Sequence, residues 1–236
     1  MRALNNADFL SLWENGHGLH PLDRGLLAIR ASLSEQASEP VADWPLGRRN
    51  RALAELRMLY FGPKLRGWTA CEQCDEKLEF EVDCRAMAEM PEPSAQPIAY
   101  AGASFRLPTS RDLASIAGER DPDQAALHLL QNCEIEPATP ESMHSWSNDE
   151  LEDVAGKMAL ADPLAEIALG FACPVCQHSS EETLDLPSFL WSEIESRAKR
   201  LLLEIHTLAS AYGWAEAAIL AMSDVRRATY LQMVTA

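Results

Sequence analysis

Two Cys-x-x-Cys pairs that lie far apart in the chain constrain its fold more than any other feature of the sequence. The first pair, Cys71 and Cys74, opens the stretch "CEQCDEKLEFEV". The second pair, Cys173 and Cys176, opens "CPVCQHSSEETLDL". Strand-like alternation follows each pair, and 98 residues separate Cys74 from Cys173 in a chain of 236 residues. The chain therefore either builds two separate sites or folds so that the two pairs meet.

A single shared metal site is the hypothesis that explains both pairs. Zinc in a structural site takes four tetrahedral ligands, which two Cys-x-x-Cys turns on adjacent hairpins supply. The spacing is far longer than in a compact zinc ribbon, but the cost of closing a loop grows only logarithmically with its length. We therefore predict a split zinc ribbon with one structural Zn²⁺. Its four ligands are Cys71, Cys74, Cys173 and Cys176.

Three alternatives remain open for these cysteines. A thioredoxin-like redox pair needs a helix after the Cys-x-x-Cys, whereas a strand follows each pair here. Four reduced thiols without metal, or two local disulfides, are the others. His178 is a rival ligand, because it lies two residues after Cys176. Cys84 and Cys133 lie in apolar stretches, and we expect them in the core.

Composition and charge narrow the classes of partner. The chain is 47% hydrophobic, enough to bury a core, and its net charge is −16. Residues 1–69 carry 9 basic and 7 acidic residues, whereas residues 70–236 carry 11 basic and 29 acidic residues. Nucleic-acid binding needs clustered Lys and Arg, so we expect no nucleic-acid partner. The sequence has no apolar run that would span a membrane and no signal-peptide core, which predicts a cytoplasmic protein without membrane insertion.

Helical periodicity dominates both ends of the chain. Asn5 or Asn6 is expected to cap a first helix, and Pro21 to open a second. A third, "LGRRNRALAELRMLYF", ends at Gly62-Pro63 and is predicted to bury one face. The apolar residues of that face are Leu53, Leu56, Leu59 and Tyr60. Near the C-terminus, apolar spacing predicts a helix from Trp191 to Tyr212 that ends at Gly213, then a short helix, then one capped by Ser223.

In the middle of the chain, the spacing of apolar residues is typical of strands in some segments and of helices in others. Strict alternation of Leu78, Phe80 and Val82 predicts a half-buried strand over residues 77–83. "ASFRLP" reads as a further short strand, residues 108–168 as three helices without a strand, and "ETLDLPSFLW" as a strand-like run that Pro187 breaks. The predicted fold is mainly α, with a small β zinc ribbon split by a helical insertion. Its segments are an N-terminal helical region (1–66), the first half of the ribbon (67–107), the insertion (108–168), the second half (169–188) and C-terminal helices (189–236).

Motifs of catalysis are missing from the sequence. No Gly-rich phosphate loop, H-E-x-x-H helix or G-x-S-x-G elbow occurs. A zinc ion with four thiolate ligands has no open coordination position, so it stabilises and does not catalyse. His206 is expected to be a polar residue at the edge of the long C-terminal helix. We therefore predict that the protein is not an enzyme.

Six stretches, spread over nearly the whole chain, share one resemblance. They are "LWENGHGLHPLDRGLLAI", "PLGRRNRALAELRMLYFGPKL", the first Cys pair, "LPTSRDLASIAG", "ALADPLAEIALGFACPVC" and "SFLWSEIESRAKRLLLEIHTLASAYGWAEAAILAMSDVRRATYLQMV". Together they resemble the T4-type baseplate proteins of contractile phage tails and related injection systems, most specifically in the last stretch. The resemblance implies a minor component or chaperone of baseplate or hub assembly.

The predicted function is therefore structural. Its expected partners are baseplate, hub, tube or spike proteins, and the protein acts during cytoplasmic assembly or stays in the finished particle. We expect Trp214 to anchor a partner, with Arg226 and Arg227 as charged contacts at the rim of that interface, because Trp and Arg are enriched among binding hot spots. The alternatives are a zinc-ribbon adaptor that binds nucleic acid or the transcription machinery, and a zinc enzyme that releases one thiolate.

Overall fold

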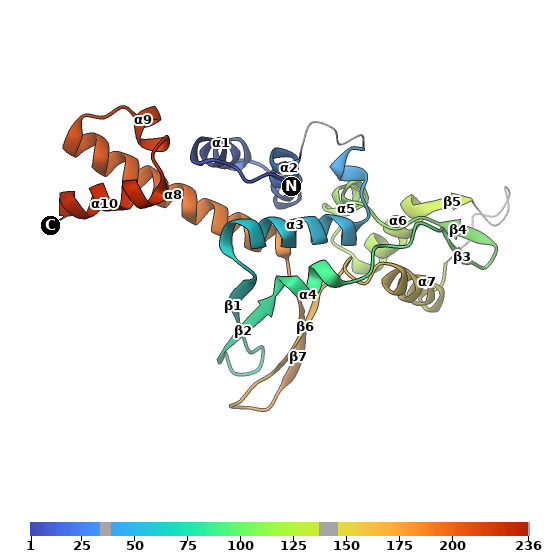
Figure 1. Cartoon of the computed structure of the whole chain (residues 1–236). Helices are drawn as coiled ribbons and strands as arrows, with labels where there is room; N and C mark the ends of the chain where they lie inside the picture. The colour runs from blue at the N-terminus through green and yellow to red at the C-terminus, as the bar shows by residue number, and fades with distance from the viewer. Residues whose placement is uncertain (34–38, 137–145, 236) are drawn as a thin grey trace. The chain divides into compact units, whose positions relative to one another are not determined.

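The computed structural model describes residues 1–33, 39–136 and 146–235 (Figure 1). The chain divides into two compact units. The terminal unit combines residues 1–36 with residues 187–236, and the central unit spans residues 37–186. Helices predominate and the sheets are small, as predicted. Among the described residues, no helix is both long enough and apolar enough to cross a bilayer.

The terminal unit is built from helices at both ends of the chain. They are α1 (Asn6–Gly16), α2 (Pro21–Ser32), α8 (Leu186–Tyr212, whose first residue lies in the central unit), α9 (Glu216–Leu220) and α10 (Asp224–Thr235). The predicted helix starts are confirmed: the Asn5 side chain accepts a hydrogen bond from the Asp8 N–H, and Pro21 is the first residue of α2. The Arg226 N–H likewise donates to the Ser223 hydroxyl.

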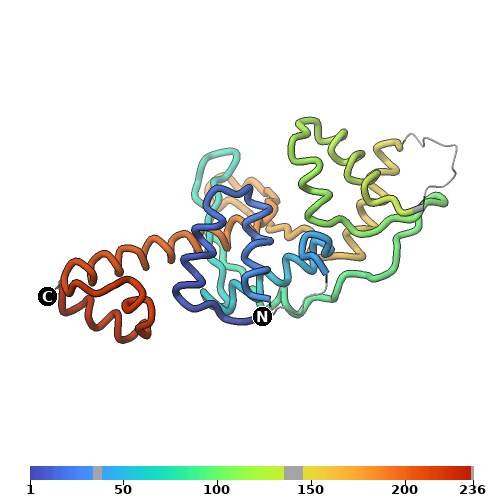
Figure 2. Tube along the Cα trace, turned by 90° about the horizontal axis from the view of Figure 1, so that it is seen from above, coloured from blue at the N-terminus to red at the C-terminus, as the bar shows by residue number. Residues whose placement is uncertain are grey.

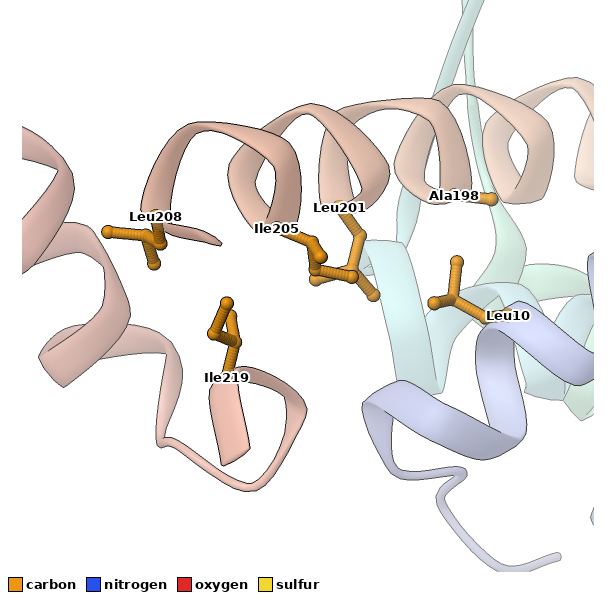
Figure 3. Close-up of a cluster of buried hydrophobic side chains, with 6 residues drawn as sticks. All are labelled: Leu10, Ala198, Leu201, Ile205, Leu208 and Ile219. Carbon is orange, nitrogen blue, oxygen red and sulfur yellow. The ribbon is translucent and has the colours of Figure 1, made fainter. Parts of the chain in front are cut away.

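Apolar side chains of α1, α8 and α9 form the core of this unit. Figure 3 shows them converging between the helices: Leu10, Ala198, Leu201, Ile205, Leu208 and Ile219. Gly16 lets the end of α1 lie close to Trp191 of α8, because a Cβ at this position would lie 2.2 Å from the Trp191 ring. Gly213 ends α8 as predicted, since its φ of 65° leaves the right-handed helical region.

The central unit alternates helices with short antiparallel strands. Its helices are the short 3₁₀ helix η1 (Val41–Asp43), α3 (Leu46–Phe61), α4 (Cys84–Glu89), α5 (Ser110–Ile116), α6 (Pro122–Cys133) and α7 (Asn148–Ala161). Its strands are β1 (Lys64–Ala70), β2 (Lys77–Asp83), β3 (Ile98–Tyr100), β4 (Ala103–Phe105), β5 (Glu134–Glu136), β6 (Ala168–Ala172) and β7 (Ser179–Thr183). They pair as β1-β2, β3-β4-β5 and β6-β7.

Helix α3 is capped by a side chain that is distant in sequence. Pro45 precedes the helix and offers no capping side chain, but Asp162 accepts a hydrogen bond from the Gly47 N–H at 2.8 Å. Asn50, in the next turn, donates to the Leu164 carbonyl at 2.7 Å. Burial raises the pKa of Asp162, although the N–H groups of Gly47 and Leu164 lower it. The turn after α7 is thereby tied to the start of α3.

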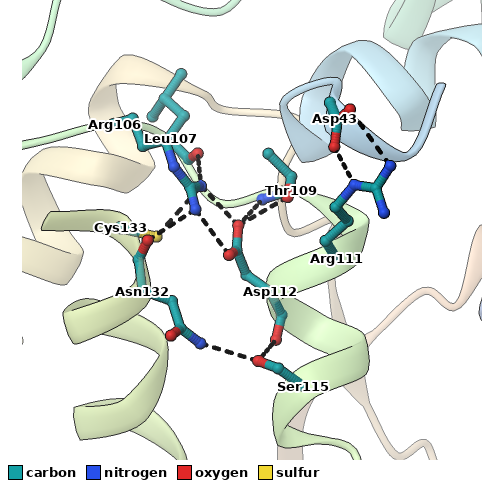
Figure 4. Close-up of polar contacts among 9 residues, drawn as sticks. All are labelled: Asp43, Arg106, Leu107, Thr109, Arg111, Asp112, Ser115, Asn132 and Cys133. Carbon is teal, nitrogen blue, oxygen red and sulfur yellow. Dashed lines mark hydrogen bonds and ion pairs between the residues drawn. The ribbon is translucent and has the colours of Figure 1, made fainter. Parts of the chain in front are cut away.

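A network of polar side chains joins helix α5 to its neighbours. Asp112 and Thr109 form a capping box at the start of α5, and the Arg106 guanidinium donates to both Asp112 oxygens at 2.6 and 2.8 Å (Figure 4). Arg106 also donates to the Asn132 carbonyl at the end of α6. These charge-assisted bonds position α5 against α6.

Several sequence predictions are wrong in detail. The three helices of residues 108–168 are present as α5, α6 and α7, but β5 also lies there and pairs with β4. Pro187 does not break a strand: β7 ends at Thr183 and Pro187 is the second residue of α8, where its missing N–H costs nothing. Leu59 is 47% exposed, whereas Leu53 and Leu56 are fully buried.

Candidate metal centre

Two antiparallel hairpins of the central unit carry the Cys-x-x-Cys turns. Strand β1 leads into Cys71, and β2 returns in register, with Ala70 opposite Lys77. Strand β6 leads into Cys173, and β7 returns with Ala172 opposite Ser179. Each turn thus joins two strands. The strands that lead into the turns, β1 and β6, were not predicted from the sequence.

The backbones of the two turns form equivalent hydrogen bonds. In the first turn, the Cys71 N–H donates to the Glu76 carbonyl at 2.8 Å, and the Asp75 N–H donates to the Cys71 carbonyl at 2.9 Å. In the second turn, the Cys173 N–H donates to the His178 carbonyl, and the Gln177 N–H donates to the Cys173 carbonyl, each at 2.9 Å. The residue after the second cysteine is left-handed in both turns: φ is 57° at Asp75 and 60° at Gln177. The two turns are therefore two copies of one local structure.

The hairpins lie side by side, as the views in Figures 1 and 2 agree. The Thr69 hydroxyl of β1 donates to the Glu182 carboxylate of β7 at 2.7 Å. The rings of Phe80 in β2 and Phe171 in β6 meet edge to face, with centroids 5.8 Å apart. These contacts bring the two turns together across the intervening residues.

All four predicted ligands meet in one cluster. Their sulfur atoms all lie within 4.8 Å of one another. Two cross pairs, Cys71–Cys176 and Cys74–Cys173, have their sulfurs 3.6 Å apart. Four sulfurs around a zinc ion at about 2.3 Å would be separated by about 3.8 Å, whereas a disulfide needs about 2.05 Å. The four cysteines are free, and their spacing fits a single metal ion.

Backbone N–H groups favour the thiolate form at one ligand. The N–H groups of Cys176 and Val175 point at the Cys173 sulfur and lower its pKa to about 7, against partial desolvation. At Cys74, the Glu76 N–H lowers the pKa, but desolvation and the three neighbouring sulfurs outweigh it and raise the pKa to about 12. Without a cation, sulfurs this close cannot all ionise. The cluster therefore has the electrostatics that a divalent cation relieves.

The other candidate residues lie outside this cluster. His178 uses its backbone carbonyl in the turn, and its Nε2 lies 3.9 Å from a Glu72 oxygen. Cys84 and Cys133 are fully buried, as predicted for core residues. Desolvation raises the pKa of Cys133 to about 11. His206 is exposed on α8, as expected of a polar edge residue.

Trp214 is half-buried between two tyrosines of the terminal unit. It stacks on Tyr212 with ring centroids 4.5 Å apart, and meets Tyr230 edge-on at 4.8 Å. Arg226 is exposed, with its guanidinium carbon 5.7 Å from the centre of the Tyr230 ring. A partner-binding role for these two residues stays a prediction.

Arg227 differs in its surroundings from Arg226, although both were predicted as charged contacts at the rim of a partner interface. It is buried, and it donates to Glu204 of α8 at 2.7 Å and to Asp224 at 2.9 Å. The reason is register: on α10, Arg227 faces α8, whereas Arg226 is rotated toward solvent. The sequence contains the acidic partner, Glu204, but only the fold shows that Arg227 and not Arg226 reaches it.

The fold and site together define a mainly helical protein with a four-cysteine cluster that could hold one metal ion. Comparisons with known protein families, with curated proteins and with solved structures find no match to this chain.

Proposed function

We propose that this protein is a non-enzymatic structural or assembly component of a phage-tail-like baseplate or hub, stabilised by one structural zinc ion. The zinc proposal is supported by one observation: two hairpins bring together Cys71, Cys74, Cys173 and Cys176. The baseplate assignment rests on the resemblance of the six sequence stretches described above.

A zinc or iron ion fits the cluster better than magnesium or calcium does. Four thiolates in a tetrahedral arrangement favour Zn²⁺ or an iron site over Mg²⁺ and Ca²⁺, which prefer oxygen ligands. Two equivalent turns on paired hairpins are the arrangement of a zinc ribbon, here with α4 to α7 between its halves. Because four sulfurs fill the coordination shell, the metal would hold the hairpins together and leave no position for a substrate.

Charges on the hairpins favour a protein partner over nucleic acid. Lys64 and Arg66 both pair with Glu81, at 2.6 and 2.7 Å, and Lys77 pairs with Glu79 at 2.8 Å. Residues 64–83 contain three basic and six acidic residues, and this excess of negative charge disfavours phosphate binding. This observation weighs against the zinc-ribbon adaptor that binds nucleic acid.

Co-expression with tube, spike and hub proteins encoded near the same gene tests the baseplate role. The expected result is co-purification of one of these proteins and loss of assembled particles when the gene is deleted. Intact particles in the deletion strain, together with no co-purification, would refute the role. The zinc proposal is tested separately by metal analysis, so either proposal can fail alone.

A further inference from the structure

A shallow groove lies between α6 and α7 in the central unit. It has a volume of about 180 Å³, is open to solvent, and is lined by Asp123, Ala126, Asn148, Leu151, Glu152 and Ala155. An apolar cavity of about 150 Å³ accepts a benzene molecule, so this hollow has room for one side chain the size of Leu or Phe. The groove takes no part in the metal cluster.

The apolar residues of the groove are two alanines and one leucine. Ala126 and Ala155 are exposed, and Leu151 is half-buried. Ala159, one turn after Ala155, continues the exposed stripe along α7. From Asn148 to Ala159 this stripe is about 17 Å long, at about 1.5 Å per residue. Small side chains at this spacing let another helix approach closely.

The rim of the groove is acidic. Residues 121–133 and 147–161, which form the two helices and their N-caps, contain six acidic residues and one basic residue. The basic residue, Lys157, lies over the Tyr100 ring at 4.9 Å. Among the described residues, no cation pairs with Asp123 or Glu152 at the rim. The rim therefore offers two carboxylates to an incoming positive charge.

We propose that the groove between α6 and α7 binds a basic amphipathic helix of a partner protein. One apolar side chain of that helix sits over Ala126, Leu151 and Ala155, and flanking Lys or Arg side chains lie beside Asp123 and Glu152. A helix fits better than a strand, because the backbone groups of α6 and α7 are already used within each helix. The acidic rim repels nucleic acid and anionic membranes.

A fluorescein-labelled synthetic peptide tests the proposal by anisotropy at about 0.15 M salt, near physiological ionic strength. The probe has about 18 residues, or five helical turns, with Leu at helical i, i+3, i+4, i+7 spacing and Lys on both sides of that stripe. Three full-length proteins are compared: the natural chain, Asp123→Lys with Glu152→Lys, and the control Glu55→Lys with Glu216→Lys. The control residues are exposed helical glutamates, so both variants change the net charge equally. Circular dichroism confirms that each variant is folded.

The groove variant should bind the peptide at least tenfold more weakly, and the control within twofold of the natural chain. A third variant, Ala155→Trp, fills the hollow without changing charge and should weaken binding at least fivefold. Equal binding by the groove and control variants would overturn the proposal, as would unaltered binding by Ala155→Trp. So would sedimentation that shows a dimer of this chain which the groove variant abolishes, because the occupant would then be a second copy.

Discussion

Arg226 and Arg227 show how one residue step changes the role of a side chain. Arg227 is 6% exposed and bonds two carboxylates, one of them on α8. Arg226 lies in solvent against the Tyr230 ring. Buried charges stabilise only while they are paired, whereas exposed charges are worth little. Arg227 therefore holds α10 to α8, and Arg226 is available to a partner.

Replacing each arginine by glutamine separates these roles. Arg227→Gln should lower the free energy of unfolding by about 1.5–3 kcal/mol, because it removes hydrogen bonds from a charged group and leaves Glu204 unpaired. Arg226→Gln should change it by no more than about 0.5 kcal/mol. Urea unfolding measures both values. Equal effects of the two substitutions would show that Arg227 is not the tie between the helices.

At the four-cysteine cluster, Cys173→Ser should disrupt both hairpins and not only its own. Metal-binding free energy is folding free energy when the ligands come from separate segments. We expect metal content to fall well below that of the natural protein, and hydrogen exchange to rise around Cys71 as well as around Cys176. Cys84→Ser is the control, since it alters a buried thiol outside the cluster and should leave the metal content unchanged. Continued protection of residues 64–83 in Cys173→Ser would mean that the pairs are not partners.

At the scale of elements, caps decide where the helices begin. The start of α3 depends on Asp162, and there is no room for a side chain at Gly47, because a Cβ would lie 1.7 Å from the Asp162 Oδ1. Gly156, in the interior of α7, has open space where a Cβ would lie, with nothing within 4 Å beyond the backbone of its own helix. The two glycines therefore respond to the same substitution in opposite ways.

Gly47→Ala should destabilise the protein by about 2–4 kcal/mol, through overpacking and loss of the cap. Gly156→Ala should stabilise it by about 0.5–1 kcal/mol, because alanine is the better helix former. Thermal or urea unfolding of the two variants measures whether each substitution lowers or raises the free energy of unfolding. A neutral Gly47→Ala would show that Asp162 does not cap α3.

The capping box of α5 should make stability depend on pH. Desolvation raises the pKa of Asp112, but Arg106 and Thr109 together lower it further, so its folded pKa lies below its ordinary value. A lowered carboxyl pKa gives stability that is present above the unfolded pKa and is lost as pH falls through the folded pKa. The natural protein should therefore exceed Asp112→Asn in unfolding free energy at about pH 7, and the difference should shrink below about pH 4. A difference that does not vary with pH would contradict this role.

Local chemistry explains which elements the sequence predicts. Asn5, Pro21, Gly213 and Ser223 mark helix ends in the sequence and in the structure alike, because capping is decided by a few adjacent residues. Strands β3 and β5 have three residues each, too few to show a period. Leu59 matched the helical spacing, yet its exposure depends on what packs around α3.

At the scale of the whole molecule, the four cysteines were predictable and their surroundings were not. Two Cys-x-x-Cys turns beside strands are typical of one four-ligand metal site, and the cost of closing the long loop between them grows only slowly with its length. The packing of both chain ends into one unit depends on contacts between distant residues, such as Gly16 with Trp191. The cap from Asp162 to α3 and the burial of Arg227 depend on such contacts too. The residue pattern of a short sequence segment gives no information about contacts between distant residues.

Metal stoichiometry tests the central proposal, that the two Cys-x-x-Cys pairs form one zinc site. The protein is purified under reducing conditions without added chelator, its concentration is set by amino-acid analysis, and its metals are measured by inductively coupled plasma mass spectrometry. We predict about one zinc per chain, since four thiolates complete a single tetrahedral shell. Two metal ions per chain, or none, would contradict it.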